Sequence, residues 1–135
     1  MAAFLFKTEP SAYSYADLAR DKRGVWDGVS NALALIHLRT VAKGDTVVIY
    51  HSGAEKAAVG LAVAASAPYP DPRLGDPRRV VVDLRPRRAL ATPVTLAVIR
   101  ADPVLRTLEL TRNARLSVMP VNAAQLQRLE RLGGR

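Results

Sequence analysis

Residues 44–65 read GDTVVIYHSGAEKAAVGLAVAA, and this stretch of the sequence decides the fold class. Thr46 to Tyr50 is rich in β-branched residues and lies between Gly44-Asp45 and Ser52-Gly53, which is typical of a strand followed by a turn. Ala57 to Ala65 predicts a second strand, in which Gly60 indicates a bulge or a close approach of another segment. Strands therefore form the centre of the predicted fold.

Further strands are expected on both sides of this stretch. Phe4-Leu5-Phe6 predicts a short buried strand near the start of the chain, and residues 116–119 predict the last one. Residues 79–90 predict a long strand with one mostly apolar face, and Pro86 within it indicates an edge strand or a bulge. The segment PYPDP at residues 68–72 predicts a stiff loop.

Helices are predicted from their capping residues. Ser14, with Asp17 three residues later, resembles a capping box, and Asn31 is expected to open a deeply buried helix that runs to Gly44. Three later helical starts are expected at Thr95, at Asp102-Pro103 and at Asn122, the last helix ending at Gly133-Gly134. The predicted class is α+β, a single domain over residues 1–135 with a bent or barrel-like mixed sheet decorated by short helices.

The charge of the chain indicates a polyanionic partner. The formal net charge is +8 and the pI is about 10.6, and sixteen of the twenty basic residues are arginines. Arginine offers a planar fork suited to phosphate or base contacts, so nucleic acid is the first candidate partner. The alternative is that the arginine and alanine content reflects a GC-rich genome, in which case the charge says little about function.

Several classes are excluded or disfavoured by what the sequence lacks. There is no cysteine, which excludes disulfides, thiolate metal sites and a cysteine nucleophile. No run approaches the ~20 apolar residues of a spanning helix, and Lys7 interrupts any secretory signal, so we expect a cytoplasmic protein with no membrane partner.

Nine short segments, in order, resemble the EVE domain family of the PUA-like superfamily. They are residues 4–10 (FLFKTEP), 13–18 (YSYADL), 25–31 (VWDGVSN), 43–45 (KGD), 50–53 (YHSG), 59–60 (VG), 67–72 (APYPDP), 93–96 (PVTL) and 115–121 (RLSVMPV). The resemblance implies a PUA-like pseudobarrel with a pocket for a nucleobase, modified cytosine in DNA being the favoured ligand. At residues 30–36 the chain has SNALALI where many members carry a polar and aromatic run, and this pattern resembles a bacterial subgroup.

The matched segments contain the groups that a base reader needs. A base taken out of its stack requires an aromatic or apolar wall, donors and acceptors for its edge, and cations for the phosphates. Trp26, the only tryptophan, is either the stacking wall or a core anchor, and Asn31 either contacts ligand or only caps its helix. The predicted base pocket comprises Lys7, Thr8, Glu9, Pro10, Trp26, Gly28, Val29, Asn31, Tyr50, His51, Ser52 and Ser117, with Tyr13, Tyr15 and Tyr69 as weaker candidates.

Arginines near the end of the Pro-rich loop and along the long strand are the predicted phosphate contacts. Alternation places Arg79, Arg85 and Arg87 on one strand face, unless Pro86 shifts the phase, and Arg115 is a further candidate. The alternative is a solvated charged face.

No catalytic residue, cofactor or metal site is predicted. Adjacent His51 and Ser52 point to opposite faces of a strand, and His37 on an apolar helix is expected to pack rather than to bind metal. The favoured function is a non-catalytic module that reads a modified base, with modified DNA preferred as partner. The alternatives are a PUA-like RNA-binding module and, more remotely, a small-molecule-binding protein or a hydrolase.

Overall fold

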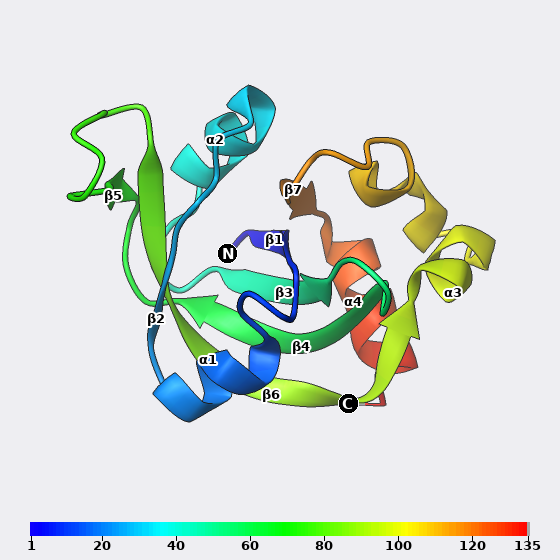
Figure 1. The fold of residues 1–135 in the computed structure, drawn as a ribbon. Helices are drawn as coiled ribbons and strands as arrows, with labels where there is room; N and C mark the ends of the chain where they lie inside the picture. Colours follow the sequence, from blue (N-terminus) through cyan, green and yellow to red (C-terminus); the bar gives the residue numbers. More distant parts are fainter. Residues whose placement is uncertain (135) are drawn as a thin grey trace.

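The computed structural model describes residues 1–134, which form a curled mixed sheet with four short helices around it (Figure 1). The strands are β1 (Ala3–Thr8), β2 (Gly24–Trp26), β3 (Thr46–His51), β4 (Ala57–Ala64), β5 (Tyr69–Pro70), β6 (Val80–Thr95) and β7 (Val118–Val121). The helices are α1 (Tyr15–Asp21), α2 (Ala32–Arg39), α3 (Leu96–Ala101) and α4 (Ala123–Leu132), with 3₁₀ turns η1 (Leu105–Thr107) and η2 (Glu109–Thr111). The predicted α+β class is confirmed.

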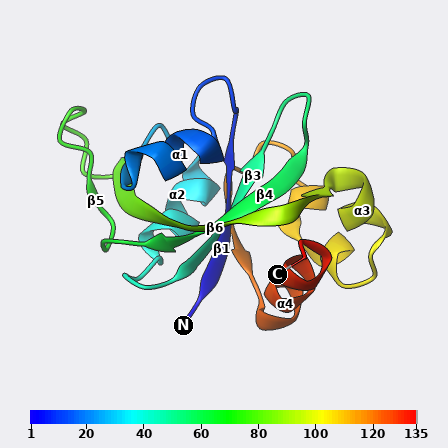
Figure 2. The same cartoon turned by 90° about the horizontal axis from the view of Figure 1, so that it is seen from below.

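The sheet has the strand order β2-β6-β4-β3-β1-β7, and β5 pairs with β6 outside this path. Only β1 and β3 run parallel; the other neighbours are antiparallel. Figures 1 and 2 show α3 and α4 gathered at one end of the molecule and β5 at the other. The long strand β6 connects the two ends, so it carries the pairing of β2 and β5 as well as that of β4.

Irregular pairing between β4 and β6 bends the sheet. The register shifts between Ala58 and Gly60 and again between Leu61 and Ala62, where Ala62 faces Pro86. Such bulges increase local twist and curvature, which lets a long strand wrap around a core. The predictions of a bulge at Gly60 and at Pro86 are both confirmed.

Gly60 also allows α1 to approach the sheet closely. A Cβ atom at this position would lie 2.4 Å from Cε1 of Tyr15, closer than any real side-chain contact. The Tyr15 ring is buried, and its hydroxyl donates to the carbonyl of Leu61 at 2.8 Å. The missing side chain of Gly60 therefore fixes where α1 lies.

Four of the five predicted helix starts are confirmed. At Asp102-Pro103 no α-helix begins: Asp102 accepts from the N–H groups of Val104 and Leu105, and only the 3₁₀ turn η1 follows. Ser14 and Asp17 form a capping box at α1, and Asn122 and Gln125 form another at α4. Asn31 caps α2, and the Thr95 hydroxyl caps α3. These signals succeed because each capping side chain accepts from a backbone N–H only three residues later in the chain.

Several elements differ from the sequence prediction, including the long strand expected over residues 79–90, which runs from Val80 to Thr95. Helix α2 ends at Arg39, well before Gly44, and it is not deeply buried, since Leu33 and Ile36 are 41% and 54% exposed. Residues 69–70 of the expected loop form β5, and the last strand begins at Val118 rather than at residue 116. Strand β2 was not predicted at all, because three residues held only by pairing with β6 carry no periodic signal.

A continuous apolar core lies inside the curled sheet. Phe6, Leu18, Leu38, Ile49 and Leu61 are among its largest fully buried side chains. Within residues 1–134, no helix has the length and apolar character needed to cross a membrane.

Candidate functional site

A pocket of about 400 Å³ opens where the end of β1 lies near β2. Seven residues line it: Lys7, Thr8, Ala12, Tyr13, Val25, Trp26 and Asp27. They come from the last two positions of β1, from the turn that leads to α1, and from β2 with the residue after it. The structure thus brings together three predicted residues, Lys7, Thr8 and Trp26, from segments about twenty positions apart.

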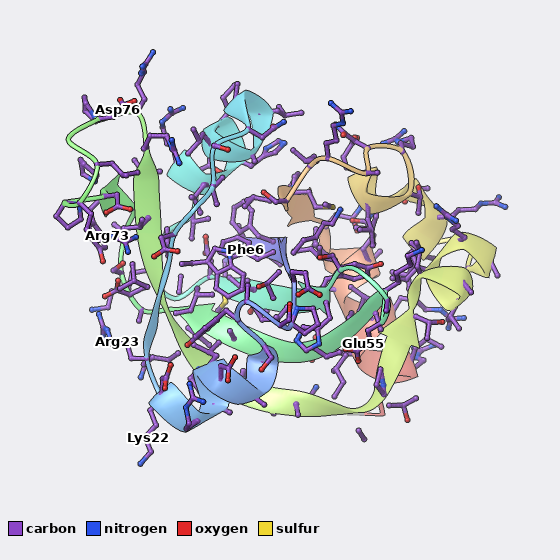
Figure 3. The ribbon with its side chains drawn as sticks, viewed as in Figure 1. Phe6, Lys22, Arg23, Glu55, Arg73 and Asp76 are labelled. Carbon is purple, nitrogen blue, oxygen red and sulfur yellow. The ribbon has the colours of Figure 1, made fainter. Side chains whose placement is uncertain are left out.

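Trp26 is both a core residue and a wall of the pocket. Only 7% of its surface is exposed, and its ring packs at 45° on Phe6, with 5.7 Å between ring centroids. Figure 3 shows Phe6 in the middle of the molecule, inside the curled sheet. Trp26 is thus a core anchor, as one of the two sequence interpretations expected, and it also borders the pocket, where the stacking role stays a prediction.

Tyr13 completes the aromatic part of the pocket. Its ring meets Trp26 edge-on at 6.2 Å and 80°, and its hydroxyl donates to Asp21 at 3.0 Å. Burial, followed by the hydrogen bond and the charge of Asp21, raises the pKa of Tyr13 to about 12. The phenol therefore stays neutral at physiological pH and is anchored to α1. Sequence reasoning ranked Tyr13 as a weak candidate, because the turn that carries it has no pattern of its own.

The polar groups at the end of β1 are held in place by the backbone. The Lys7 ammonium donates to the carbonyl of Ala114 at 2.7 Å, and the Thr8 hydroxyl donates to the carbonyl of Tyr13 at 2.7 Å. Burial lowers the pKa of Lys7. An ammonium has three donors, so Lys7 keeps two for a ligand, while the Thr8 oxygen can still accept.

Asp27 supplies a carboxylate to the pocket, and the sequence analysis missed it. Its Oδ2 accepts from Arg73 at 2.5 Å, and the same guanidinium binds the buried carboxylate of Asp71 at 3.0 Å. Arg73 lies at the edge of the molecule near β5, as Figure 3 shows, so the β5 segment fixes Asp27 from outside. The only sequence signal for Asp27 was its place between Trp26 and Gly28, both of which were selected.

Glu9 does not line this pocket. Its Oε2 accepts from the backbone N–H of Ser11 at 2.8 Å and from the Ser11 hydroxyl, and these bonds lower the pKa of Glu9. Its carboxylate lies against Gly53, whose φ of +78° favours glycine. The Glu9 side chain therefore closes its own turn, which also contains Pro10, instead of pairing with Lys7.

His51 holds the start of α1. Its Nε2 accepts from the backbone N–H of Tyr15 at 3.0 Å, and its Nδ1 contacts Glu55 at 2.7 Å. An accepting Nε2 requires the proton on Nδ1, which then donates to Glu55. Tyr50, His51 and Ser52 do not line the pocket, although they are neighbours of residues that do. Tyr50 and His51 pair with Lys7 and Thr8 across β3 and β1, and the N–H of Ser52 donates to the carbonyl of Thr8.

The remaining predicted base contacts do not line the pocket. Gly28 has a φ of +78°, Val29 is buried, and the Asn31 side chain caps α2 through the N–H of Ala34 at 3.0 Å. Ser117 accepts the backbone N–H of Lys7 at 2.9 Å through its carbonyl.

The predicted phosphate contacts fall into three places. Arg79 donates to the carbonyl of Val29 at 3.1 Å and borders a hollow beside α2, whereas Arg85 and Arg87 border another hollow. The structure thus separates Arg79 from the other two, since β6 begins only after it. Arg115 is exposed and follows Ala114, the residue that binds Lys7 at the pocket.

No cluster of three or more His, Asp or Glu side chains able to share a metal ion occurs among residues 1–134. His37 lies half-buried on α2. The chemistry of the pocket is therefore that of an aromatic wall with a cation, a hydroxyl and a carboxylate.

Comparisons with known proteins agree on one family. The model of the EVE domain matches residues 2–132. Among solved structures, Rpa0253 from Rhodopseudomonas palustris is 36% identical, with 99% of this chain and 94% of that chain covered and a TM-score of 0.93. Atu2648 from Agrobacterium tumefaciens is 30% identical over 99% of this chain and 94% of that chain, with a TM-score of 0.94.

A human protein shares the fold at lower identity. THYN1, solved in complex with DNA containing 5-methylcytosine, is 23% identical over 100% of this chain and 99% of that chain, with a TM-score of 0.89. The expected PUA-like fold is confirmed by these neighbours. A search among curated proteins found no match.

Proposed function

The chain belongs to the EVE domain family, and from this membership we propose that it is a non-catalytic, single-domain module that binds nucleic acid and reads a modified base in the pocket between β1 and β2. The observation that carries the proposal is the composition of this pocket. An aromatic wall of Trp26 and Tyr13 faces a space bordered by Lys7, Thr8 and Asp27. These are the groups required by a base that has left its stack.

The size and charge of the site support the same proposal. A volume of about 400 Å³ falls within the ~300–1,000 Å³ range of small-ligand pockets, enough for a single base. Asp27 can accept from an exocyclic amine, and Lys7 can donate to a base carbonyl. The net charge of +8 supplies the long-range attraction to phosphates.

A related structure indicates the class of base. Human THYN1 was solved with DNA that contains 5-methylcytosine. Cytosine presents an exocyclic amine and a carbonyl on one edge, a pattern that the carboxylate of Asp27 and the ammonium of Lys7 complement. Modified cytosine in DNA is therefore the favoured ligand, and a modified base in RNA is the second candidate.

Catalysis is not part of the proposal, because the one histidine near β1 has no free ring nitrogen. His51 uses Nε2 for Tyr15 and Nδ1 for Glu55, so it cannot serve a reacting group in its observed position.

The proposal is tested by fluorescence-polarisation binding of short DNA and RNA strands carrying plain, methylated or hydroxymethylated cytosine, or methylated adenine. We expect one modified base to bind at least tenfold more tightly than its plain parent, ~1.4 kcal/mol, with the preference retained at high salt. Weak binding to every strand that vanishes with salt would refute base reading.

The matched variants are Asp27→Asn and Asp76→Asn. Each removes a carboxylate that pairs with a loop arginine, Arg73 or Arg78, but only Asp27 lines the pocket. Loss of a good base-edge contact costs about 1–3 kcal/mol of discrimination, so Asp27→Asn should reduce the preference roughly five- to a hundredfold. Asp76→Asn should leave it unchanged.

A further inference from the structure

A second hollow, of about 400 Å³, lies on β6 just beyond the residues that pair with β2. We call it the β6 basic hollow; it is lined by Lys22, Val63, Arg85, Pro86 and Arg87. Strand β2 ends its pairing with β6 at Leu84, so the next residues of β6 pair with no strand of residues 1–134 on that side. Arg85 and Arg87 lie on either side of the bulge at Pro86, and both side chains border the hollow.

The three cations of the β6 basic hollow have no acidic partner among residues 1–134. Lys22, Arg85 and Arg87 form no salt bridge and donate no side-chain hydrogen bond there. Their immediate neighbours differ, since Arg23 pairs with Asp83 and Arg88 pairs with Glu130. Three unneutralised positive charges around one hollow repel each other, and a bound phosphate would relieve that repulsion.

The other basic hollow near a predicted phosphate contact is different in this respect. Beside α2, Arg78 pairs with Asp76, Arg39 donates to the carbonyl of Arg78, and Arg79 donates to the carbonyl of Val29. Those guanidiniums are engaged within the protein, whereas the cations of the β6 basic hollow remain available.

The edge strand β2 connects the β6 basic hollow with the base pocket. Val25 and Trp26 line the pocket at one end of β2, and Lys22 lies just before the other end, where Figure 3 shows it at the lower edge of the molecule. Lys22 has a φ of 65° and lies outside β2, so the four-residue step from Lys22 to Trp26 spans at most about 13 Å at ~3.3 Å per residue. Successive phosphates of one B-form strand advance ~3.4 Å along the axis and lie farther apart than that in space, so this span covers at most about four nucleotides.

We propose that the β6 basic hollow binds the phosphates of the strand that carries the recognised base, within about four nucleotides of that base. The proposal rests on the proposed function for the position of the base, and it adds a contact that sets the length and direction of the bound strand. Lys22 and the two arginines contact only phosphate, so they strengthen binding without choosing the base.

The test compares two triple variants with the same change of charge. Lys22→Gln/Arg85→Gln/Arg87→Gln alters the hollow, and Lys56→Gln/Arg100→Gln/Arg106→Gln alters exposed cations without ion pairs near the other end of the molecule. Lys22 and Lys56 both have positive φ, 65° and 49°, so their replacement is matched in backbone strain as well. Circular dichroism and a charge-retaining variant, Lys22→Arg/Arg85→Lys/Arg87→Lys, control for folding.

The measurement is binding of labelled strands in which the preferred modified base is followed by two, four, six or eight nucleotides, first on one side and then on the other. For the wild type we expect at least tenfold tighter binding once one side reaches about four nucleotides. The salt dependence should steepen by about 2–3 units of slope, at ~0.7–0.9 per phosphate. The hollow variant should lose the dependence on strand length and the steeper salt dependence but keep the base preference. The control and charge-retaining variants should keep the length dependence, the salt dependence and the base preference.

Two results would overturn the proposal: a hollow variant that keeps the length dependence and slope of the wild type, or a control variant that loses them equally. A failure of the proposed function is a separate observation. In that case plain and modified strands bind alike, whatever the two triple variants do to the salt slope.

Discussion

Replacing Gly60 by alanine should destabilise the protein because the new methyl group would enter the space of the Tyr15 ring. A Cβ atom there lies 2.4, 2.6 and 2.7 Å from three ring carbons of Tyr15. The ring cannot move away easily, since its hydroxyl donates to Leu61 at 2.8 Å and its own backbone N–H donates to His51 at 3.0 Å. Adding an atom to this part of the core therefore displaces α1.

The expected cost combines two effects. Overpacking a close-packed core costs about 1–3 kcal/mol, and losing the tyrosine hydrogen bond costs about 1 kcal/mol more. We therefore expect Gly60→Ala to lower the free energy of unfolding by about 2–4 kcal/mol. Because Tyr13 lines the pocket two residues before Tyr15, binding of the preferred base should weaken as well.

Urea unfolding followed by the fluorescence of the single tryptophan, Trp26, measures this cost. A double-mutant cycle with Tyr15→Leu isolates the contact, because the shorter side chain removes the ring. In that background Gly60→Ala should cost less than about 0.5 kcal/mol or even stabilise, since Ala has less freedom than Gly in the unfolded chain. Equal costs of Gly60→Ala in the two backgrounds would refute the reasoning.

Two other predictions concern polar groups that hold the site. His51→Leu removes the acceptor for the backbone N–H of Tyr15, so it should lower the free energy of unfolding in urea by about 1–3 kcal/mol. His51→Gln keeps a side-chain acceptor and should recover part of this loss. Equal losses in the two variants would contradict the role of His51 as acceptor at the start of α1. The side-chain and backbone hydrogen bonds from Arg73 hold the pKa of Asp71 below its ordinary value of 3.8. The ionised Asp71 carboxylate therefore stabilises the fold above that pH, and this contribution is lost as the pH falls through the lower folded-state pKa. The free energy of unfolding, measured as a function of pH, should therefore fall less steeply below about pH 4 in Asp71→Asn than in the wild type.

Parts of the site could be predicted because the residues themselves carry the signal. Trp26 stood out as a lone tryptophan, and Lys7 and Thr8 stood out as polar residues after a buried strand. Tyr13 and Asp27 could not be ranked in the same way, since their place in the pocket depends on how a turn and an edge strand meet. Glu9 and His51 have side chains suited to binding, but their partners in the fold, Ser11 and Tyr15, already engage them.

The sequence by itself determined what depends on neighbours in the chain. β-Branched runs predicted β3 and part of β6, and Ser14, Asn31, Thr95 and Asn122 predicted helix starts whose hydrogen bonds close within three residues. Gly60 and Pro86 predicted irregular pairing, because a missing side chain and a missing N–H affect any sheet that contains them.

Only the tertiary structure decided what depends on distant segments. Strand β2 exists through its pairing with β6. Helix α2 ends at Arg39, although the sequence contains no helix-ending glycine or proline between Arg39 and Gly44. The pocket requires Thr8 and Trp26 to meet across the curled sheet, and the β6 basic hollow requires Lys22 to lie beside Arg85 and Arg87. These contacts join residues from about eighteen to more than sixty positions apart, and pairing and packing, which no local pattern encodes, bring them together.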